Sequence, residues 1–164
     1  MTTRRSRIRR LTGAALAVPL MAGAAVVAPA PMAQAHDNRS SVLEWRDTSE
    51  CPCYLWDEYD GTYFQRDVGG EAFRGRIYSG GELVGKVEFH PYGEKLWVYD
   101  TKANGDALYV TVTWGEHEEY GIKVPSGGGT VRDLGNIPEG EPVRIKVWDD
   151  GFYEDELFRA WVHA

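Results

Sequence analysis

From residue 73 onward the chain alternates short β-prone runs with turn signals, and this pattern limits the fold more than any other feature. The runs are rich in Val, Ile, Tyr, Phe, Trp and Thr, and Gly, Pro or Asn separates them, as is typical of antiparallel β proteins. Helical periodicity is nearly absent. The expected strands are residues 73–78, 83–89, 95–100, 107–114, 120–124, 130–134, 143–148 and 157–163. The sequence therefore predicts an all-β protein.

Two hairpins are expected. Asn104-Gly105 lies between two of the runs and predicts a hairpin over residues 95–114. A second hairpin is predicted at the C-terminus, where three apolar side chains share one face of each strand. We expect these six side chains in the core: Val143, Ile145, Val147, Phe158, Ala160 and Val162.

Seven or eight strands in one unit predict a single-domain β-sandwich of Ig-like or jelly-roll type, with a small β-barrel as the alternative. Residues 73–164 form its main part. Residues 36–72 mix many aromatic and acidic side chains. We expect this segment to be an N-terminal arm, with one or two strands, that packs onto the sandwich, because so many aromatic residues argue against disorder.

Residues 1–35 have the pattern of an export signal. Five arginines precede an uncharged run rich in Ala, Val and Leu, and Ala33-Gln34-Ala35 offers a cleavage site. A retained membrane helix is the alternative, because the uncharged run is long enough to span a bilayer. Pro19 and the abundant Ala and Gly favour cleavage before His36. The sequence thus predicts a secreted, extracellular protein that is not bound to a membrane after cleavage.

The charge argues against nucleic acid as a partner. The formal net charge is −7. Cleavage after Ala35 removes five arginines and no acid, which leaves −12 over 129 residues. Nucleic-acid binding needs clustered Lys and Arg that release counterions. The charge is better explained by solubility outside the cell.

The two cysteines form the sequence Cys51-Pro52-Cys53. A tight disulfide between them is the favoured interpretation, and an intermolecular bridge and a thiolate metal site are the alternatives. A bridge this short removes little chain entropy. Redox catalysis is disfavoured because there is no Cys-x-x-Cys pair followed by a helix.

No residue is assigned a catalytic role. The few serines lie in no setting that resembles a nucleophile site, and carboxylates are so abundant that no pair stands out as a glycosidase pair. Runs of charge are usually solvated surface. Cleavage before His36 would leave a histidine as the first residue, whose amine and imidazole could chelate copper with His90, His117 or His163. The alternative is that the cut falls there by chance.

A calcium site is the metal hypothesis for the C-terminal hairpin, where crowded carboxylates would repel one another unless a cation or solvent screened them. Residues 100–111 resemble an EF-hand loop, but Lys102 takes a ligand position and Thr111 the place of the bidentate acid. No cofactor is expected to be required. The candidate calcium ligands are Asp149, Asp150, Glu154, Asp155 and Glu156.

Aromatic and cationic side chains alternate on the other face of the same hairpin. If this face is exposed, Trp148 and Trp161, flanked by Arg144 and Arg159, form a flat platform suited to a sugar ring or a partner protein. The alternative is that other elements cover the tryptophans, because Arg–Trp stacking is ordinary cross-strand packing.

Residues 95–101 (KLWVYDT), Asn104-Gly105, Tyr109-Val110 and residues 138–147 (PEGEPVRIKV) resemble a family of small secreted proteins of actinomycetes (Streptomyces-like) without an assigned function. The resemblance covers about half of the chain after residue 35. It implies export and an all-β fold, and no activity. Relatives often carry cysteines in this region, where this chain has none, so a shared disulfide scaffold is not implied.

Three hypotheses about function follow. The leading one is a secreted, non-catalytic β-domain that binds an extracellular or cell-surface ligand, either a polysaccharide or a protein. The first alternative is a protease inhibitor that presents a rigid loop near Cys51–Cys53 or residues 126–129. The second is a small metal-dependent or hydrolytic enzyme.

Overall fold

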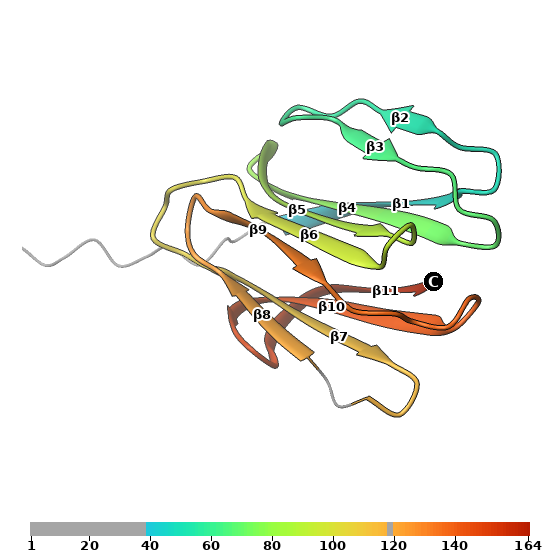
Figure 1. The fold of residues 1–164 in the computed structure, drawn as a ribbon. Coiled ribbons are helices and arrows are strands. Elements are labelled where there is room, and N and C mark those ends of the chain that lie inside the picture. The colour runs from blue at the N-terminus through green and yellow to red at the C-terminus, as the bar shows by residue number, and fades with distance from the viewer. Residues whose placement is uncertain (1–38, 118–119) are drawn as a thin grey trace, which may run out of the picture. The chain divides into compact units, whose positions relative to one another are not determined.

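The computed structural model describes residues 39–117 and 120–164, and this part of the chain consists of strands, turns and loops (Figure 1). The predicted all-β fold class is confirmed. The strands are β1 (Arg39–Asp47), β2 (Cys53–Leu55), β3 (Thr62–Phe64), β4 (Glu71–Ser79), β5 (Glu82–His90), β6 (Lys95–Asp100), β7 (Leu108–Trp114), β8 (Tyr120–Val124), β9 (Gly129–Asp133), β10 (Pro142–Gly151) and β11 (Glu154–His163).

Nine of the strands form two antiparallel sheets that share one apolar core. The five-stranded sheet has the order β1-β4-β5-β6-β9, and the four-stranded sheet has the order β11-β10-β7-β8. Core side chains come from both, for example Phe73, Val87 and Phe89 from the first and Val110, Ile145 and Phe158 from the second. Both sheets end in edge strands, so the predicted β-sandwich is the architecture and the barrel alternative is wrong.

The predicted hairpin over residues 95–114 is wrong. β6 pairs with β5 and β9, whereas β7 pairs with β10 and β8. The segment that contains Asn104-Gly105 carries the chain from one sheet to the other. Alternation of apolar and polar residues identifies a strand, but it does not identify the strand's partner. A turn sequence such as Asn-Gly occurs in connections between two sheets as well as in hairpins.

The predicted C-terminal hairpin is confirmed. Val143 lies opposite Val162, and Ile145 lies opposite Ala160. All six apolar side chains expected in the core are buried. The register shifts after Val147, so the strand ends are irregular where the acidic turn begins.

The segment before residue 73 contributes more to the fold than an arm. β1 is an edge strand of the five-stranded sheet, where Trp45 lies opposite Phe73. β2 and β3 pair with each other as a separate small hairpin. In Figure 1 this hairpin lies over the face of the five-stranded sheet that is turned away from β10 and β11.

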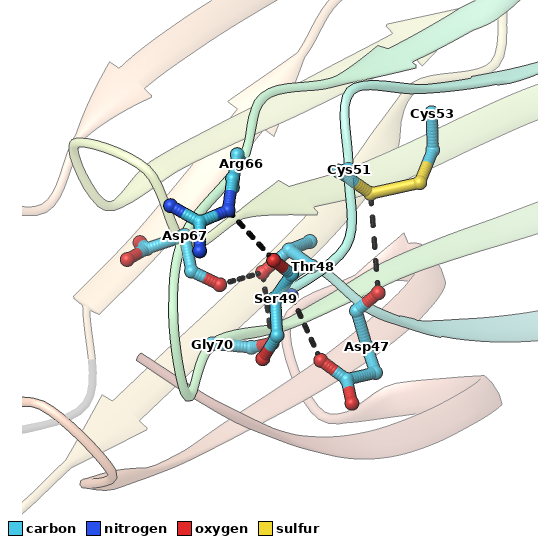
Figure 2. Close-up of a disulfide and its surroundings, with 8 residues drawn as sticks. All are labelled: Asp47, Thr48, Ser49, Cys51, Cys53, Arg66, Asp67 and Gly70. Carbon is cyan, nitrogen blue, oxygen red and sulfur yellow. Dashed lines mark hydrogen bonds between the residues drawn. A yellow bond between two sulfur atoms is a disulfide. The ribbon is translucent and has the colours of Figure 1, made fainter.

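The β2–β3 hairpin belongs to an excursion of the chain, residues 48–70, that leaves the sheet after β1 and returns to it at β4. Polar contacts join the two ends of this excursion (Figure 2). The amide of Thr48 donates to Gly70 O over 3.1 Å. The buried Thr48 hydroxyl oxygen lies 2.8 Å from Gly70 O and 2.9 Å from Asp67 O, and its single proton serves one of them at a time. Arg66 Nε donates to Ser49 O over 2.8 Å. Both ends of the excursion are therefore fixed to each other.

Two sequence predictions concern residues outside the described part of the chain: the export signal of residues 1–35 and the copper ligand His36. Within the described residues, no helix is long and apolar enough to cross a membrane.

Candidate functional site

A groove of about 370 Å³ opens on the outer face of the five-stranded sheet, beside the β2–β3 hairpin. Its floor comes from β5 and β6, and its wall from the hairpin and the turn that follows β2. This volume lies within the usual range of ligand sites. The groove is lined by Tyr54, Asp60, Gly61, Tyr63, Gln65, Glu88, His90, Tyr92, Lys95, Trp97 and Tyr99.

Aromatic rings dominate the groove because of strand alternation. Lys95, Trp97 and Tyr99 occupy alternate positions of β6, so all three face outward while Leu96 and Val98 enter the core. The ring centroids of His90 and Trp97 are 5.3 Å apart. On the opposite wall, the side chains Tyr54 and Tyr63 are more than half exposed. Aromatic side chains from both the sheet and the hairpin thus line the groove.

A charged network lies beneath the hairpin, and Lys86 is its centre. The Lys86 side chain is 0% exposed. Its Nζ lies 2.8 Å from Glu88 Oε1 and 3.1 Å from Asp57 Oδ2. It also contacts the carboxylate of Asp60 and donates to Gly61 O over 3.1 Å.

Two tyrosine rings complete the surroundings of this ammonium group. Lys86 Nζ is 5.1 Å from the ring centroid of Tyr99 and 5.7 Å from that of Tyr59. A cation near aromatic faces gains electrostatic stabilisation when it is removed from water. A fully buried lysine needs such partners, because an unpaired buried charge costs several kcal/mol.

Asp57 is held by the turn that follows it. Its Oδ1 accepts hydrogen bonds from the backbone amides of Tyr59, Asp60 and Gly61, over 2.9–3.1 Å. Its Oδ2 faces Arg74 Nη1 at 3.3 Å as well as Lys86. Gly61 has a φ of +74°, and a side chain at this position would collide with Tyr54. The turn therefore needs glycine here.

The carboxylates of Asp57 and Glu88 are stabilised in their charged forms. Burial raises the pKa of Glu88, but hydrogen bonds from His90, Lys86 and Thr62 outweigh it and leave the pKa lowered. Burial also raises the pKa of Asp57, but the amides of Tyr59 and Gly61 together with Lys86 hold it well below its usual range. A glycosidase acid needs a raised pKa so that it stays protonated. Neither carboxyl group meets this requirement.

The oxygens of Asp57, Asp60 and Glu88 lie close enough together to ligate a metal ion. The ammonium of Lys86 contacts all three carboxylates. The chain therefore supplies its own cation at this position, and the geometry does not call for a metal ion there.

The five carboxylates of the C-terminal hairpin do not converge on one centre. Arg39 pairs with Asp149 and, over 3.1 Å, with Asp155. Glu156 pairs with Arg159 Nε over 2.7 Å. Asp149 and Asp150 instead approach Asp106 from the preceding crossing segment. The five predicted ligands therefore do not form a single calcium site. Calcium binding by part of this region stays a prediction.

The predicted two-tryptophan platform does not form. Trp148 is 7% exposed, and its indole nitrogen donates to Thr111 Oγ1 over 3.2 Å. Trp161 is 53% exposed, and the Arg144 guanidinium lies 5.7 Å from its ring centroid. Trp148 keeps the predicted face, because the register with β7 is unbroken and Lys146 lies over its ring. The ring of Tyr153, from the turn after β10, packs on it at 5.4 Å between centroids, so the alternative that other elements cover this tryptophan holds. Arg159 pairs with Glu156.

Cys51 and Cys53 form a disulfide with an S–S distance of 2.05 Å (Figure 2). The favoured interpretation of the cysteine pair is therefore confirmed. Cys51 is buried against Phe64 and Ala72 in a small apolar cluster. This cluster attaches the hairpin to the outer face of the sheet at the end opposite to Lys86.

The three described histidines lie in different surroundings. His90 Nε2 is 2.9 Å from Glu88 Oε2, His117 packs against Trp114, and His163 Nδ1 is 3.3 Å from Glu71 Oε2. Neither carboxylate cluster with metal-ligand spacing in the described residues contains a histidine. Copper binding through His36 stays a prediction.

The groove was not predicted from the sequence. Its signal was present in the outward positions of two neighbouring strands: Lys86, Glu88 and His90 on β5, and Trp97 and Tyr99 on β6. These polar and aromatic residues are typical of a solvated sheet face. What distinguishes them is the hairpin above them, which comes from a distant part of the chain. No family model, curated protein or solved structure matches this chain.

Proposed function

We propose that this protein is an extracellular, non-catalytic carbohydrate-binding β-sandwich whose ligand lies in the groove over β5 and β6. The observation that carries the proposal is the groove itself, a space of about 370 Å³ lined by Tyr54, Tyr63, Tyr92, Trp97 and Tyr99. Aromatic faces suit the apolar faces of pyranose rings, and a few polar groups set orientation. Asp60, Gln65 and Lys95 offer such groups in the lining.

The charge of the groove favours an uncharged glycan. Asp60 and Glu88 line it together with Lys95, and the whole chain carries a formal charge of −7. An anionic polysaccharide would meet repulsion from both the lining and the rest of the surface. Neutral sugars meet no such cost. The lowered pKa of Glu88 and Asp57 supports binding rather than hydrolysis.

The protease-inhibitor alternative receives less support. Cys51 is buried against the sheet, so this part of the predicted loop is not offered to a protease. Ser126 and Gly127 are hydrogen-bonded to Lys102 and Asp100. Both loops are therefore parts of the packed structure, and inhibition stays a prediction.

The test is a pull-down against chitin, cellulose and peptidoglycan with three forms of the protein. A Tyr54→Ala/Tyr63→Ala variant removes the exposed hairpin rings, and Trp161→Ala is the matched control on the other sheet. We expect retention of the wild type and the control, and at least about a tenfold loss in the hairpin variant. Retention that depends on Trp161 instead would move the site to the four-stranded sheet. If no form is retained, the proposal is wrong.

A further inference from the structure

Lys86 is placed as a nucleophile toward one particular carboxyl group. Its side chain is 0% exposed, so no bulk water surrounds the amine. Nζ lies 3.1 Å from Asp57 Oδ2, and the side chain of Asp57 is also 0% exposed. The carboxylate of Asp60 touches the same amine, but its side chain is 45% exposed. Water competes for Asp60, whereas Asp57 is shielded.

The carboxyl group of Asp57 has the setting of an acyl acceptor. Three backbone amides, those of Tyr59, Asp60 and Gly61, converge on Oδ1. Donors arranged in this way stabilise the negative charge that develops on an oxygen when its carbon becomes tetrahedral. The other oxygen, Oδ2, contacts the amine as well as Arg74 Nη1 and Thr62 Oγ1, and it is the oxygen that would leave as water.

Glu88 connects the amine to that leaving oxygen. Its Oε1 lies 2.8 Å from Lys86 Nζ and 2.5 Å from Thr62 Oγ1. Thr62 Oγ1 lies 3.2 Å from Asp57 Oδ2. A proton can therefore pass from the amine to Glu88 and through the threonine hydroxyl to Oδ2, with each step over one hydrogen bond.

We propose that Lys86 and Asp57 form an intramolecular amide bond, with Glu88 as the proton carrier. Lys86 Nζ loses a proton to Glu88, which delivers it to Asp57 Oδ2. The neutral amine then attacks Asp57 Cγ, so that a C–N bond forms while Oδ1 takes up the negative charge. A second proton follows the same route, the bond from Cγ to Oδ2 breaks, and Oδ2 leaves as water. The reaction consumes one ammonium and one carboxylate and needs no oxidant or co-reactant.

The ion pair makes this reaction slow but not forbidden. Burial lowers the pKa of Lys86, but hydrogen bonds to Asp60 and Glu88 outweigh it and leave the pKa raised. The neutral amine is therefore a minor form. The proton that leaves the amine stays on a carboxyl group of the same cluster. The population of the neutral amine therefore does not change with pH between the pKa values of the lysine and of that carboxyl group. A bond that forms once in the life of a molecule tolerates a small reactive population.

Proximity favours the reaction. Two groups held in contact react as if at about 10⁵–10⁸ M, which lowers the barrier to amide formation. Because both side chains are shielded from bulk water, the water that leaves is not readily returned to hydrolyse the amide. The bond would join the turn after β2 to the centre of β5. It would lock the wall of the groove to its floor, whatever ligand the groove binds.

Mass spectrometry of the purified, reduced and alkylated protein tests the proposal. We expect the intact mass to fall short of the value calculated for the chain by one water molecule. Trypsin cannot cleave after an acylated lysine, so a branched peptide should join residues 47–66 to residues 77–95. Fragment ions place the branch at Asp57 or Asp60. A chain of full calculated mass, or a branch at Asp60, would overturn the assignment.

Variants separate the chemistry from folding. Glu88→Gln keeps the size and the hydrogen-bonding groups but cannot carry the proton, so its mass should retain the water. Lys102→Ala removes an exposed lysine outside this network and should lose water as the wild type does. Circular dichroism of both variants checks that the fold persists. Complete loss of water in Glu88→Gln would refute the role of Glu88.

Discussion

The two faces of the five-stranded sheet are built from the same strands and are held by different forces. On β5, Val87 and Phe89 enter the apolar core, while the neighbouring Lys86 and Glu88 point the other way into a charged network. The inner face is stabilised by burial of apolar surface. The outer face depends on each charge finding its partners. Apolar packing tolerates approximate fit, whereas a charged network fails when one member is missing.

The largest expected effect is at Lys86. Lys86→Met removes the only ammonium that contacts Asp57, Asp60 and Glu88 together in the described residues. Breaking a buried charge pair from one side costs about 3–5 kcal/mol. Urea denaturation measures the free energy of unfolding. If the variant is as stable as the wild type, the network does not hold the outer face.

The adjacent position tests the inner face. Val87→Ala deletes two methyl groups from the core, and we expect the free energy of unfolding to fall by about 2 kcal/mol. The same urea experiment compares the two variants directly. If Val87→Ala lowers the free energy of unfolding more than Lys86→Met does, apolar packing of the inner face contributes more to stability than the charged network of the outer face.

The disulfide tests how much of the hairpin's attachment is covalent. Cys51 and Cys53 are two positions apart, so their bond removes little entropy from the unfolded chain. A Cys51→Ala/Cys53→Ala variant should lose about 1–2 kcal/mol, mostly through the bridge. Limited proteolysis of residues 48–70 provides the readout. Rapid cleavage there in the variant would show that the disulfide, rather than Lys86, keeps the hairpin in place.

The smallest effect is expected at an exposed ion pair of the same sheet. Lys102 Nζ lies 2.9 Å from Glu82 Oε2, with both side chains well exposed. Surface pairs contribute about 0–1 kcal/mol, so Lys102→Ala should lower the midpoint of thermal unfolding by no more than about 4 °C. A loss comparable to that of Lys86→Met would mean that burial is not what gives the network its strength.

The strands could be predicted from sequence because alternation is a local property. The pairing of the strands and the cover over the outer face could not. Leu96 and Trp97 reveal a strand with two different faces, but nothing near them tells that β9 rather than β7 is the next neighbour. Strand pairing depends on the path of the whole chain. Likewise, Lys86 resembles any outward-facing lysine until a segment more than twenty residues earlier covers it.

The failure at Trp148 has a different origin. The alternation of β10 predicts that it faces away from the core, as Arg144 and Lys146 do. Trp148 does face that way, since it donates to Thr111 and lies beneath Lys146, yet it is buried because Tyr153 packs on it. Alternation predicts which face a side chain takes, but it does not show whether a later turn covers that face.

The order of the strands also determines when the molecule can be completed. β9 pairs beside β6 only after β7 and β8 have been made, and β10 pairs with β7 across two intervening strands. During synthesis, β4, β5 and β6 can pair early, yet until residues 142–163 exist their apolar face is opposed only by β7 and β8, half of the second sheet. Folding therefore has to wait for the last part of the chain, and non-local pairing makes it slow. A nascent chain that stalls before β10 would lack Phe158, whose ring packs against Phe73 of β4, and its partly covered core would make it a target for chaperones and proteases.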